Sequence, residues 1–141
     1  MAVVARCDGA ARGNPGPAAV GVVIEDESGQ ALLDFGECIG KTTNNVAEYQ
    51  AVIRAAERAL ELGATEVTFS LDSQLLARQL QGRYRVKAPH LKPLHARALQ
   101  LLEQFERWQV IEVPREQNAA ADRMANLALD KQRRGERKGD P

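Results

Sequence analysis

The chain has 141 residues and a formal net charge of zero, with 44% hydrophobic and 27% charged residues. This length suits a single domain with a substantial core, and the composition is that of an ordinary globular protein. No apolar run approaches the roughly 18 residues of a transmembrane helix, which excludes a membrane-spanning chain, and the neutral charge argues against binding a polyanion by bulk charge alone.

The first 40 residues predict three β-strands. Residues 2–8 alternate in polarity and end in an Asp-Gly pair, which is typical of a strand that runs into a turn. Residues 10–17 are rich in Gly, Pro and Asn and predict a loop. Two further β-rich runs, residues 18–26 and 31–40, predict an antiparallel meander of three strands.

The middle of the chain predicts a helix followed by a fourth strand. Apolar residues recur with helical spacing from Tyr49 to Leu60, and Gly63 supplies the stop. Residues 66–72 alternate in polarity and predict a strand. Because a long helix precedes it, this strand should run parallel to the third strand by a right-handed crossover.

The C-terminal half predicts mostly helices. Two helices and a fifth strand are expected over residues 74–81, 92–107 and 108–113. A last helix should start near Asn118, a good N-cap residue. Residues 131–141 are polar and basic, and predict a flexible C-terminal tail outside a single catalytic domain of residues 1–130.

A basic stretch lies between the fourth and fifth predicted strands. No acidic residue occurs between Asp72 and Glu103. The stretch contains Arg78, Arg83, Arg85, Lys87, Lys92 and Arg97, together with His90 and His95. Such a segment can attract phosphate locally. The alternative is a solvated helix face whose acidic residues lie elsewhere.

Three carboxylates lie where structure alone does not require them. Asp8 and Asp72 each close a hydrophobic strand, although Asp is disfavoured in strands. If the two strands are parallel neighbours, both side chains emerge at the carboxyl edge, where ligands bind in α/β sheets. Glu48 lies early in the helix stripe that faces the sheet, and Asp122, early in the last helix, is a fourth candidate.

Carboxylates in such proximity predict a metal site. Their negative charges repel one another, and a bound divalent cation usually neutralises such a cluster. Oxygen ligands favour Mg²⁺ or Mn²⁺ over zinc, and no Cys/His cluster has zinc spacing. Taken singly, Asp8 and Asp72 could be turn caps, and Glu48 a first-turn acid favoured by the helix dipole. Their convergence indicates a metal but not a reaction.

Four blocks of sequence resemble type 1 ribonuclease H in content and in order. They are Cys7-Asp-Gly-Ala-Ala-Arg-Gly-Asn-Pro-Gly-Pro17, Thr42-Thr-Asn-Asn-Val-Ala-Glu48, Leu71-Asp-Ser-Gln74 and Ala121-Asp-Arg-Met-Ala-Asn126. The resemblance implies an α/β, ribonuclease H-like fold: a mixed five-stranded sheet of order 3-2-1-4-5 flanked by helices. It also implies an endoribonuclease that hydrolyses the RNA strand of RNA–DNA hybrids.

The resemblance assigns roles to the four carboxylates. Two Mg²⁺ ions, for which Mn²⁺ can substitute, are expected on Asp8, Glu48, Asp72 and Asp122. Asp8 is similar to the carboxylate shared by both ions, Glu48 and Asp72 to those on the leaving-group side, and Asp122 to the one near the attacking water. Paired ions of this kind activate a water and stabilise the departing oxygen.

The resemblance also implies substrate contacts. Asn14, Asn44, Asn45 and Gln74 resemble residues that read the groove, and their amides can donate to and accept from the 2′-hydroxyls that distinguish RNA. Lys41 with Thr43 is similar to a pocket for a phosphate of the DNA strand. Asn44 or Asn45 could instead cap the helix, and both roles can coexist.

This sequence departs from many family members in two places. The loop at residues 113–118 lacks the His that many members carry, and Arg115, with Glu116 behind it, is the expected substitute in catalysis. The basic helical protrusion of some members is also missing. Tyr84, between Arg83 and Arg85, could line the channel for DNA or be an interface aromatic. The two histidines are expected at the surface.

Two rival functions remain. One is a related nuclease that cuts DNA or double-stranded RNA, and the Asn residues favour hybrid cleavage over it. The other is a nucleic-acid-binding module without catalysis, which four retained carboxylates argue against.

The N-terminus lacks the pattern of a signal peptide and two cysteines make no disulfide framework. We therefore expect a cytoplasmic monomer that binds a hybrid duplex, with no membrane and no obligate protein partner.

Overall fold

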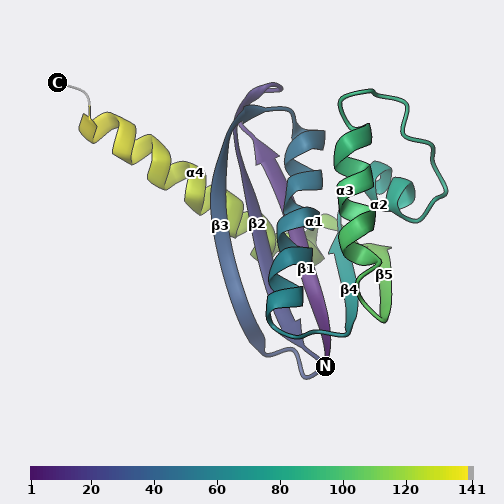
Figure 1. Cartoon of the computed structure of the whole chain (residues 1–141). Coiled ribbons are helices and arrows are strands. Elements are labelled where there is room, and N and C mark those ends of the chain that lie inside the picture. The colour runs from purple at the N-terminus through teal and green to yellow at the C-terminus, as the bar shows by residue number, and fades with distance from the viewer. Residues whose placement is uncertain (140–141) are drawn as a thin grey trace.

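The structure, a computed structural model that describes residues 1–139, is built on a mixed sheet (Figure 1). Its strands are β1 (Ala2–Ala11), β2 (Gly16–Asp26), β3 (Ala31–Thr42), β4 (Glu66–Leu71) and β5 (Arg107–Glu112). They lie in the order β3-β2-β1-β4-β5. The first three strands form an antiparallel meander, and β4 runs parallel to β1 and to β5. This confirms the predicted fold class and strand order.

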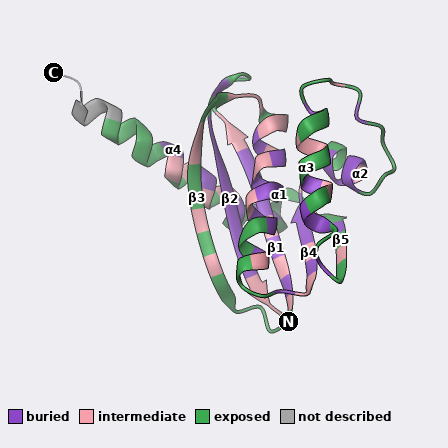
Figure 2. Ribbon diagram, in the orientation of Figure 1, coloured by how far each residue is buried: buried purple, intermediate pink, exposed green. Residues whose placement is uncertain are grey.

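Helices cover both faces of the sheet. They are α1 (Asn44–Glu61), α2 (Gln74–Leu80), α3 (Lys92–Leu102) and α4 (Ala119–Gly139), the last preceded by a 3₁₀ turn, η1 (Arg115–Asn118). The main core lies between the sheet and α1 with α3, and a smaller apolar cluster lies under α4. Figure 2 shows buried residues along β1 and β2 and exposed residues along the outer part of α4. None of the helices in the described part of the chain is both long and apolar enough to cross a membrane.

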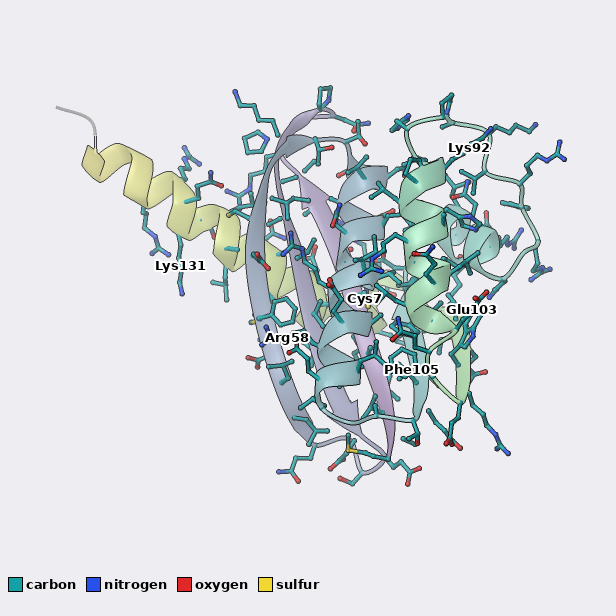
Figure 3. All side chains as sticks on the ribbon, in the orientation of Figure 1. Cys7, Arg58, Lys92, Glu103, Phe105 and Lys131 are labelled. Carbon is teal, nitrogen blue, oxygen red and sulfur yellow. The ribbon has the colours of Figure 1, made fainter. Side chains whose placement is uncertain are left out.

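Several element boundaries differ from the predicted ones because tertiary contacts set them. The loop predicted over residues 10–17 shrinks to residues 12–15, since Ala11 pairs with Ala18 across the β1–β2 hairpin. Helix α3 ends at Leu102 rather than near residue 107. Beyond its end (Figure 3), Phe105 is buried and packs edge-on against Phe69, with ring centroids 6.2 Å apart. A straight continuation of the helix could not make this contact.

The last helix is longer than the sequence indicated. It runs to Gly139 and so includes most of the segment predicted as a flexible tail, while residues 140–141 lie outside the described residues. Gly135 costs about 1 kcal/mol relative to Ala in a helix, which one residue in a long helix tolerates. The only proline of the segment is Pro141, so no ring interrupts the helix. The division into a domain of residues 1–130 and a tail remains a prediction.

Candidate active site

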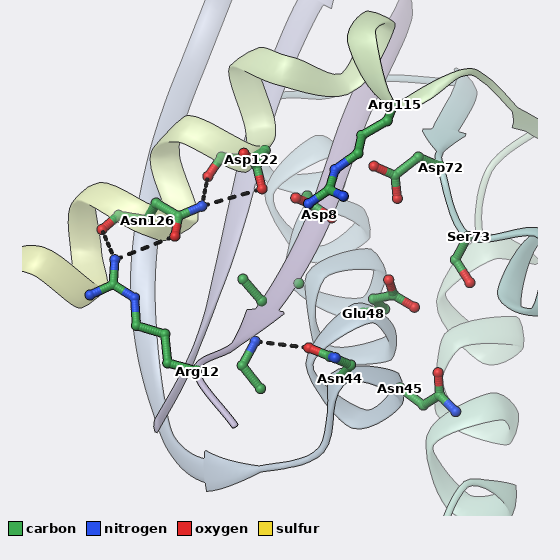
Figure 4. Close-up of a pocket in the computed structure, with 13 residues that line it drawn as sticks. Asp8, Arg12, Asn44, Asn45, Glu48, Asp72, Ser73, Arg115, Asp122 and Asn126 are labelled. Atoms are coloured by element: carbon green, nitrogen blue, oxygen red, sulfur yellow. Dashed lines mark hydrogen bonds between the residues drawn. The ribbon is translucent and has the colours of Figure 1, made fainter. Parts of the chain in front are cut away.

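Carboxylates from three elements meet at the carboxyl edge of β1 and β4. Asp8 lies near the end of β1, Glu48 lies one turn into α1, and Asp72 follows the last residue of β4. One carboxylate oxygen from each of the three lies within 4.8 Å of the others. Asp122, in the first turn of α4, lines the same pocket (Figure 4). The structure therefore brings together the four acidic residues that the sequence singled out.

Two glycines allow the helices to approach this edge. A Cβ atom on Gly9 would lie 2.2 Å from the carbonyl carbon of Ala47, so the bare backbone lets α1 pack directly on β1 beside Asp8. On the opposite face, a Cβ atom on Gly21 would lie 1.9 Å from the carbonyl oxygen of Ala121. Gly21 is the cross-strand partner of Asp8. Close helix packing thus places one acidic residue from each helix next to β1.

The carboxylates destabilise one another's charged forms. Burial, a hydrogen bond with Asp122 and the negative charges of its neighbours raise the pKa of Asp8 to about 9. Burial and the charge of Asp72 raise the pKa of Glu48 to about 7, although a hydrogen bond with Ser73 opposes the rise. Burial also raises the pKa of Asp72, against the nearby charge of Arg115. A bound cation would relieve this repulsion.

The pocket around the carboxylates has a volume of about 560 Å³ and a polar lining. Besides the four acidic residues, its lining side chains include Arg12, Asn44, Asn45, Ser73, Arg115 and Asn126. Two guanidinium groups beside a cluster of carboxylates suit a phosphate ester that is bridged to the acids by cations. Of the predicted site residues, Asn44, Asn45 and Arg115 therefore lie with the carboxylates.

The start of α1 is held by residues from the predicted substrate-binding set. Thr43 is the N-cap, and its Oγ1 accepts a hydrogen bond of 3.3 Å from the backbone N–H of Val46. The capping alternative for the two Asn residues is therefore wrong, because the N-cap position is occupied by Thr43, one residue before Asn44. Asn14 Oδ1 accepts from the backbone N–H of Asn44 at 3.0 Å, and Asn44 Oδ1 accepts from that of Ala11 at 2.9 Å.

The other predicted contacts do not line the pocket. Lys41 is exposed near the end of β3, and Gln74 is exposed at the first position of α2. Arg83, Tyr84 and Arg85 are exposed in the connection between α2 and α3. The hydroxyl of Tyr84 accepts a 2.6 Å hydrogen bond from Arg78, so part of the basic stretch is engaged within the protein.

Three polar pocket residues were missed by sequence reasoning. Ser73 caps α2 with its hydroxyl, and a Ser before a short helix was a visible signal. Asn126 follows Asp122 by four residues, a spacing that places both on one helix face. Arg12 reaches the pocket from the β1–β2 turn, and no spacing in the sequence indicates this.

One histidine departs from its predicted surface position. His95 is half-buried, with its Nε2 atom 3.1 Å from the backbone oxygen of Gln79. Its ring lies edge-on to that of the buried Tyr49, with centroids 6.3 Å apart. The helical spacing of α3 turns His95 toward α1, so it takes part in the packing between these two helices.

Comparisons with known proteins agree over most of the chain. The family model described as reverse transcriptase-like matches residues 6–128. Ribonuclease HI of Halobacterium salinarum is 46% identical over 123 residues, which cover 87% of this chain and 62% of that protein. A bifunctional protein of Mycobacterium tuberculosis is 44% identical over 92% of this chain and 36% of its own length. The chain spans less than two thirds of each of these curated relatives.

Solved structures extend the likeness to three dimensions. The crystal structure of RNase H1 from Halobacterium salinarum superposes with a TM-score of 0.91 at 44% identity, covering 93% of this chain and 99% of that chain. LC11-RNase H1, solved in complex with an RNA/DNA hybrid, gives a TM-score of 0.88 at 44% identity, covering 92% and 98% of the two chains.

Proposed function

Because the chain belongs to the type 1 ribonuclease H family, we propose that it is an endonuclease that hydrolyses the RNA strand of RNA–DNA hybrids. The observation that carries the proposal is the convergence of Asp8, Glu48 and Asp72 in a polar pocket, with one carboxylate oxygen from each within 4.8 Å of the others. The similarity to a ribonuclease solved with a hybrid duplex supports the choice of substrate.

The pocket residues fit divalent cations. The donors are all carboxylate oxygens, which Mg²⁺ prefers, and burial together with the negative charges of their neighbours raises their pKa values. We assign two Mg²⁺ ions, replaceable by Mn²⁺, to Asp8, Glu48, Asp72 and Asp122. When bound, such ions supply an activated water and stabilise the departing oxygen.

The remaining pocket residues would bind and orient the substrate. The charge of Arg115 opposes the rise that burial causes in the pKa of Asp72, so the Arg115 guanidinium lies where it can also neutralise charge on a phosphoryl group. Asn44 uses its side-chain oxygen to accept a hydrogen bond from Ala11, which leaves its amide N–H groups to donate to a 2′-hydroxyl, and Asn45 lines the same pocket.

Substrate contacts outside the pocket belong to the same proposal. Asn14 and Gln74 would read the minor groove, and Lys41 with Thr43 would hold a phosphate of the DNA strand. The hydroxyl of Thr43 accepts a hydrogen bond from the helix, so its own proton is available to such a phosphate. Arg83, Tyr84 and Arg85 would follow the DNA strand farther from the metals.

We extend the proposal to a cytoplasmic, monomeric enzyme without an obligate protein partner. Light scattering on the purified chain tests the monomer.

The experiment that tests the function is incubation of labelled hybrid, double-stranded RNA and double-stranded DNA with Mg²⁺, Mn²⁺ or EDTA. We expect cleavage of the RNA strand of the hybrid with either metal and none with EDTA. Preferential cleavage of either other duplex would favour a related nuclease. Binding of the hybrid without any cleavage would favour a binding module and overturn the proposal.

Loss of the basic side chains between α2 and α3 should weaken binding without slowing chemistry. In the triple variant Arg83→Ala, Arg85→Ala, Lys87→Ala we expect a strongly raised KM and a largely unchanged kcat, because phosphate contacts position a duplex without touching the scissile bond. The log–log salt slope of binding should fall by roughly 0.7–0.9 per lost contact.

A matched control removes three charges elsewhere. Lys131, Arg133 and Arg134 are exposed on the outer part of α4, and Figure 3 labels Lys131 there. Replacing them by Ala should leave KM nearly unchanged. If the first triple variant keeps the wild-type KM and salt slope, the basic stretch is only a solvated surface.

Arg115→Ala should show the opposite kinetic pattern. We expect kcat to fall by about a hundredfold with little change in KM, because the guanidinium beside Asp72 acts on charge that develops during the reaction. Steady-state kinetics on the hybrid measure this. Arg107→Ala, which removes an 82% exposed guanidinium at the start of β5, is the control. A raised KM with normal kcat would make Arg115 a binding residue only.

A further inference from the structure

The turn between β1 and β2 is bonded to both helices that carry pocket carboxylates. Toward α1, Asn14 and Asn44 form the pair of backbone contacts described above. Toward α4, the guanidinium of Arg12 donates to Asp130 Oδ1 at 2.7 Å. The same nitrogen lies 3.4 Å from both the side-chain and the backbone oxygen of Asn126 (Figure 4). One short turn therefore ties the helix of Glu48 to the helix of Asp122.

Asn126 is bonded to Arg12 on one side and to the carboxylate of Asp122 on the other. Its Nδ2 donates to Asp122 Oδ1 at 3.2 Å and to the backbone oxygen of Asp122 at 3.0 Å. A guanidinium can only donate hydrogen bonds, so Arg12 requires the oxygen of the Asn126 amide on its side. The NH₂ group must then face Asp122. The identity of the residue at position 12 thus fixes the orientation of the amide at position 126.

We propose that Arg12 and Asn126 are positioning residues that hold the Asp122 carboxylate in the orientation needed to bind a cation. Asp122 is only half-buried, and its carboxylate is bonded to Asn126 as well as to Asp8, so without the Asn126 amide its side chain would sample more rotamers. Groups that hydrogen-bond a metal-ligating side chain commonly fix its orientation and thereby raise the affinity for the metal. The proposal rests on the metal-dependent function proposed above.

The test is calorimetric titration of Mn²⁺ into the protein without nucleic acid. For Asn126→Ala we expect the affinity to fall about tenfold. Arg12→Ala should cause a smaller fall, and no further fall when Asn126 is already Ala, because it acts through that amide. Arg12→Lys, which can still donate to Asn126, should recover most of the lost affinity. The Mg²⁺ concentration for half-maximal cleavage should shift in parallel.

Arg54→Ala is the matched control. Arg54 pairs with Glu37 at 2.6 Å between α1 and β3, and the two side chains are 31% and 50% exposed. The corresponding values for Arg12 and Asp130 are 37% and 50%. The control should lower the melting temperature about as much as Arg12→Ala does and leave Mn²⁺ affinity unchanged.

Two results would overturn the proposal. Unchanged Mn²⁺ affinity in both the Arg12 and Asn126 variants would show that these contacts only hold the β1–β2 turn against α4. A raised KM and a smaller salt slope for Arg12→Ala, with normal Mn²⁺ affinity, would make Arg12 a phosphate contact. Failure of the proposed function would look different. If the wild type and the variants show the expected order of Mn²⁺ affinities but the wild type cuts no hybrid, the proposed function is refuted and the positioning role is kept.

Discussion

Asp8→Asn should abolish cleavage of the hybrid while raising the stability of the metal-free protein. Asp8 is the most buried member of the carboxylate cluster and faces the other three acids. Losing the metal chemistry it supports should cost about 4 kcal/mol in the transition state, or about a thousandfold in rate. In the metal-free protein at neutral pH, Asp8 must take up a proton on folding, whereas Asn does not, so the free energy of unfolding in EDTA should rise.

The pH dependence of stability follows from the raised pKa values. The pKa of Asp8 is about 9 in the folded protein against an ordinary 3.8, so between these limits the folded state holds a proton that the unfolded state has lost. Stability in EDTA should therefore be greatest in acid and fall as pH rises through this window. The Glu48 carboxyl, with a pKa near 7, adds to the fall in the lower part of the window. Asp8→Asn should flatten the curve.

Thermal unfolding in EDTA from pH 5 to pH 9, with hybrid cleavage in Mg²⁺, tests both effects. The control is Asp26→Asn, since hydrogen bonds with Ser28 and Gln30 lower the pKa of Asp26. That variant should lose stability and keep full activity. Near-normal Mg²⁺-dependent cleavage by Asp8→Asn would refute the metal-site assignment.

Much of this site could be predicted because its signals are local. Asp8 and Asp72 stand out as acids that end hydrophobic strands, and Glu48 as an acid on an apolar helix stripe. Parallel pairing of β1 with β4 then requires the two aspartates to share one edge. The convergence of these acids therefore follows from the predicted secondary structure and from the right-handed crossover between parallel strands.

What could not be predicted depends on contacts between distant segments. Arg12 reaches the pocket only because the β1–β2 turn packs against α4, more than 100 residues later in the chain. Residues 10, 11, 16 and 17 have a composition typical of a loop, but they extend β1 and β2 because each pairs with a residue of a neighbouring strand. Thr43 rather than an Asn caps α1, because the hairpin turn engages Asn44 instead. The spacing of residues in the sequence predicts neither the contact of Arg12, nor the longer strands, nor the cap of α1.

Gly9→Ala should disrupt both the fold and the site. The new Cβ would lie 2.2 Å from the carbonyl carbon of Ala47, 2.3 Å from the backbone nitrogen of Glu48 and 2.5 Å from the oxygen of Ala47. All three are backbone atoms, so no side-chain rotation relieves the overlap. Helix α1 must move away from β1 and open the core beneath it, which should cost about 3 kcal/mol or more. Denaturant unfolding in EDTA measures this loss.

The same displacement should carry Glu48 away from Asp8, so Mn²⁺ affinity should fall even where the variant remains folded. Gly21→Ala is the companion variant: its Cβ would meet the oxygen of Ala121 at 1.9 Å, and it should displace α4 with Asp122 instead. Gly135→Ala is the control, because nothing lies within 4 Å of its Cβ position and α4 is helical there. That change should stabilise the protein by up to about 1 kcal/mol. A folded Gly9→Ala variant with normal stability and normal Mn²⁺ affinity would show that close packing of α1 on β1 does not position Glu48.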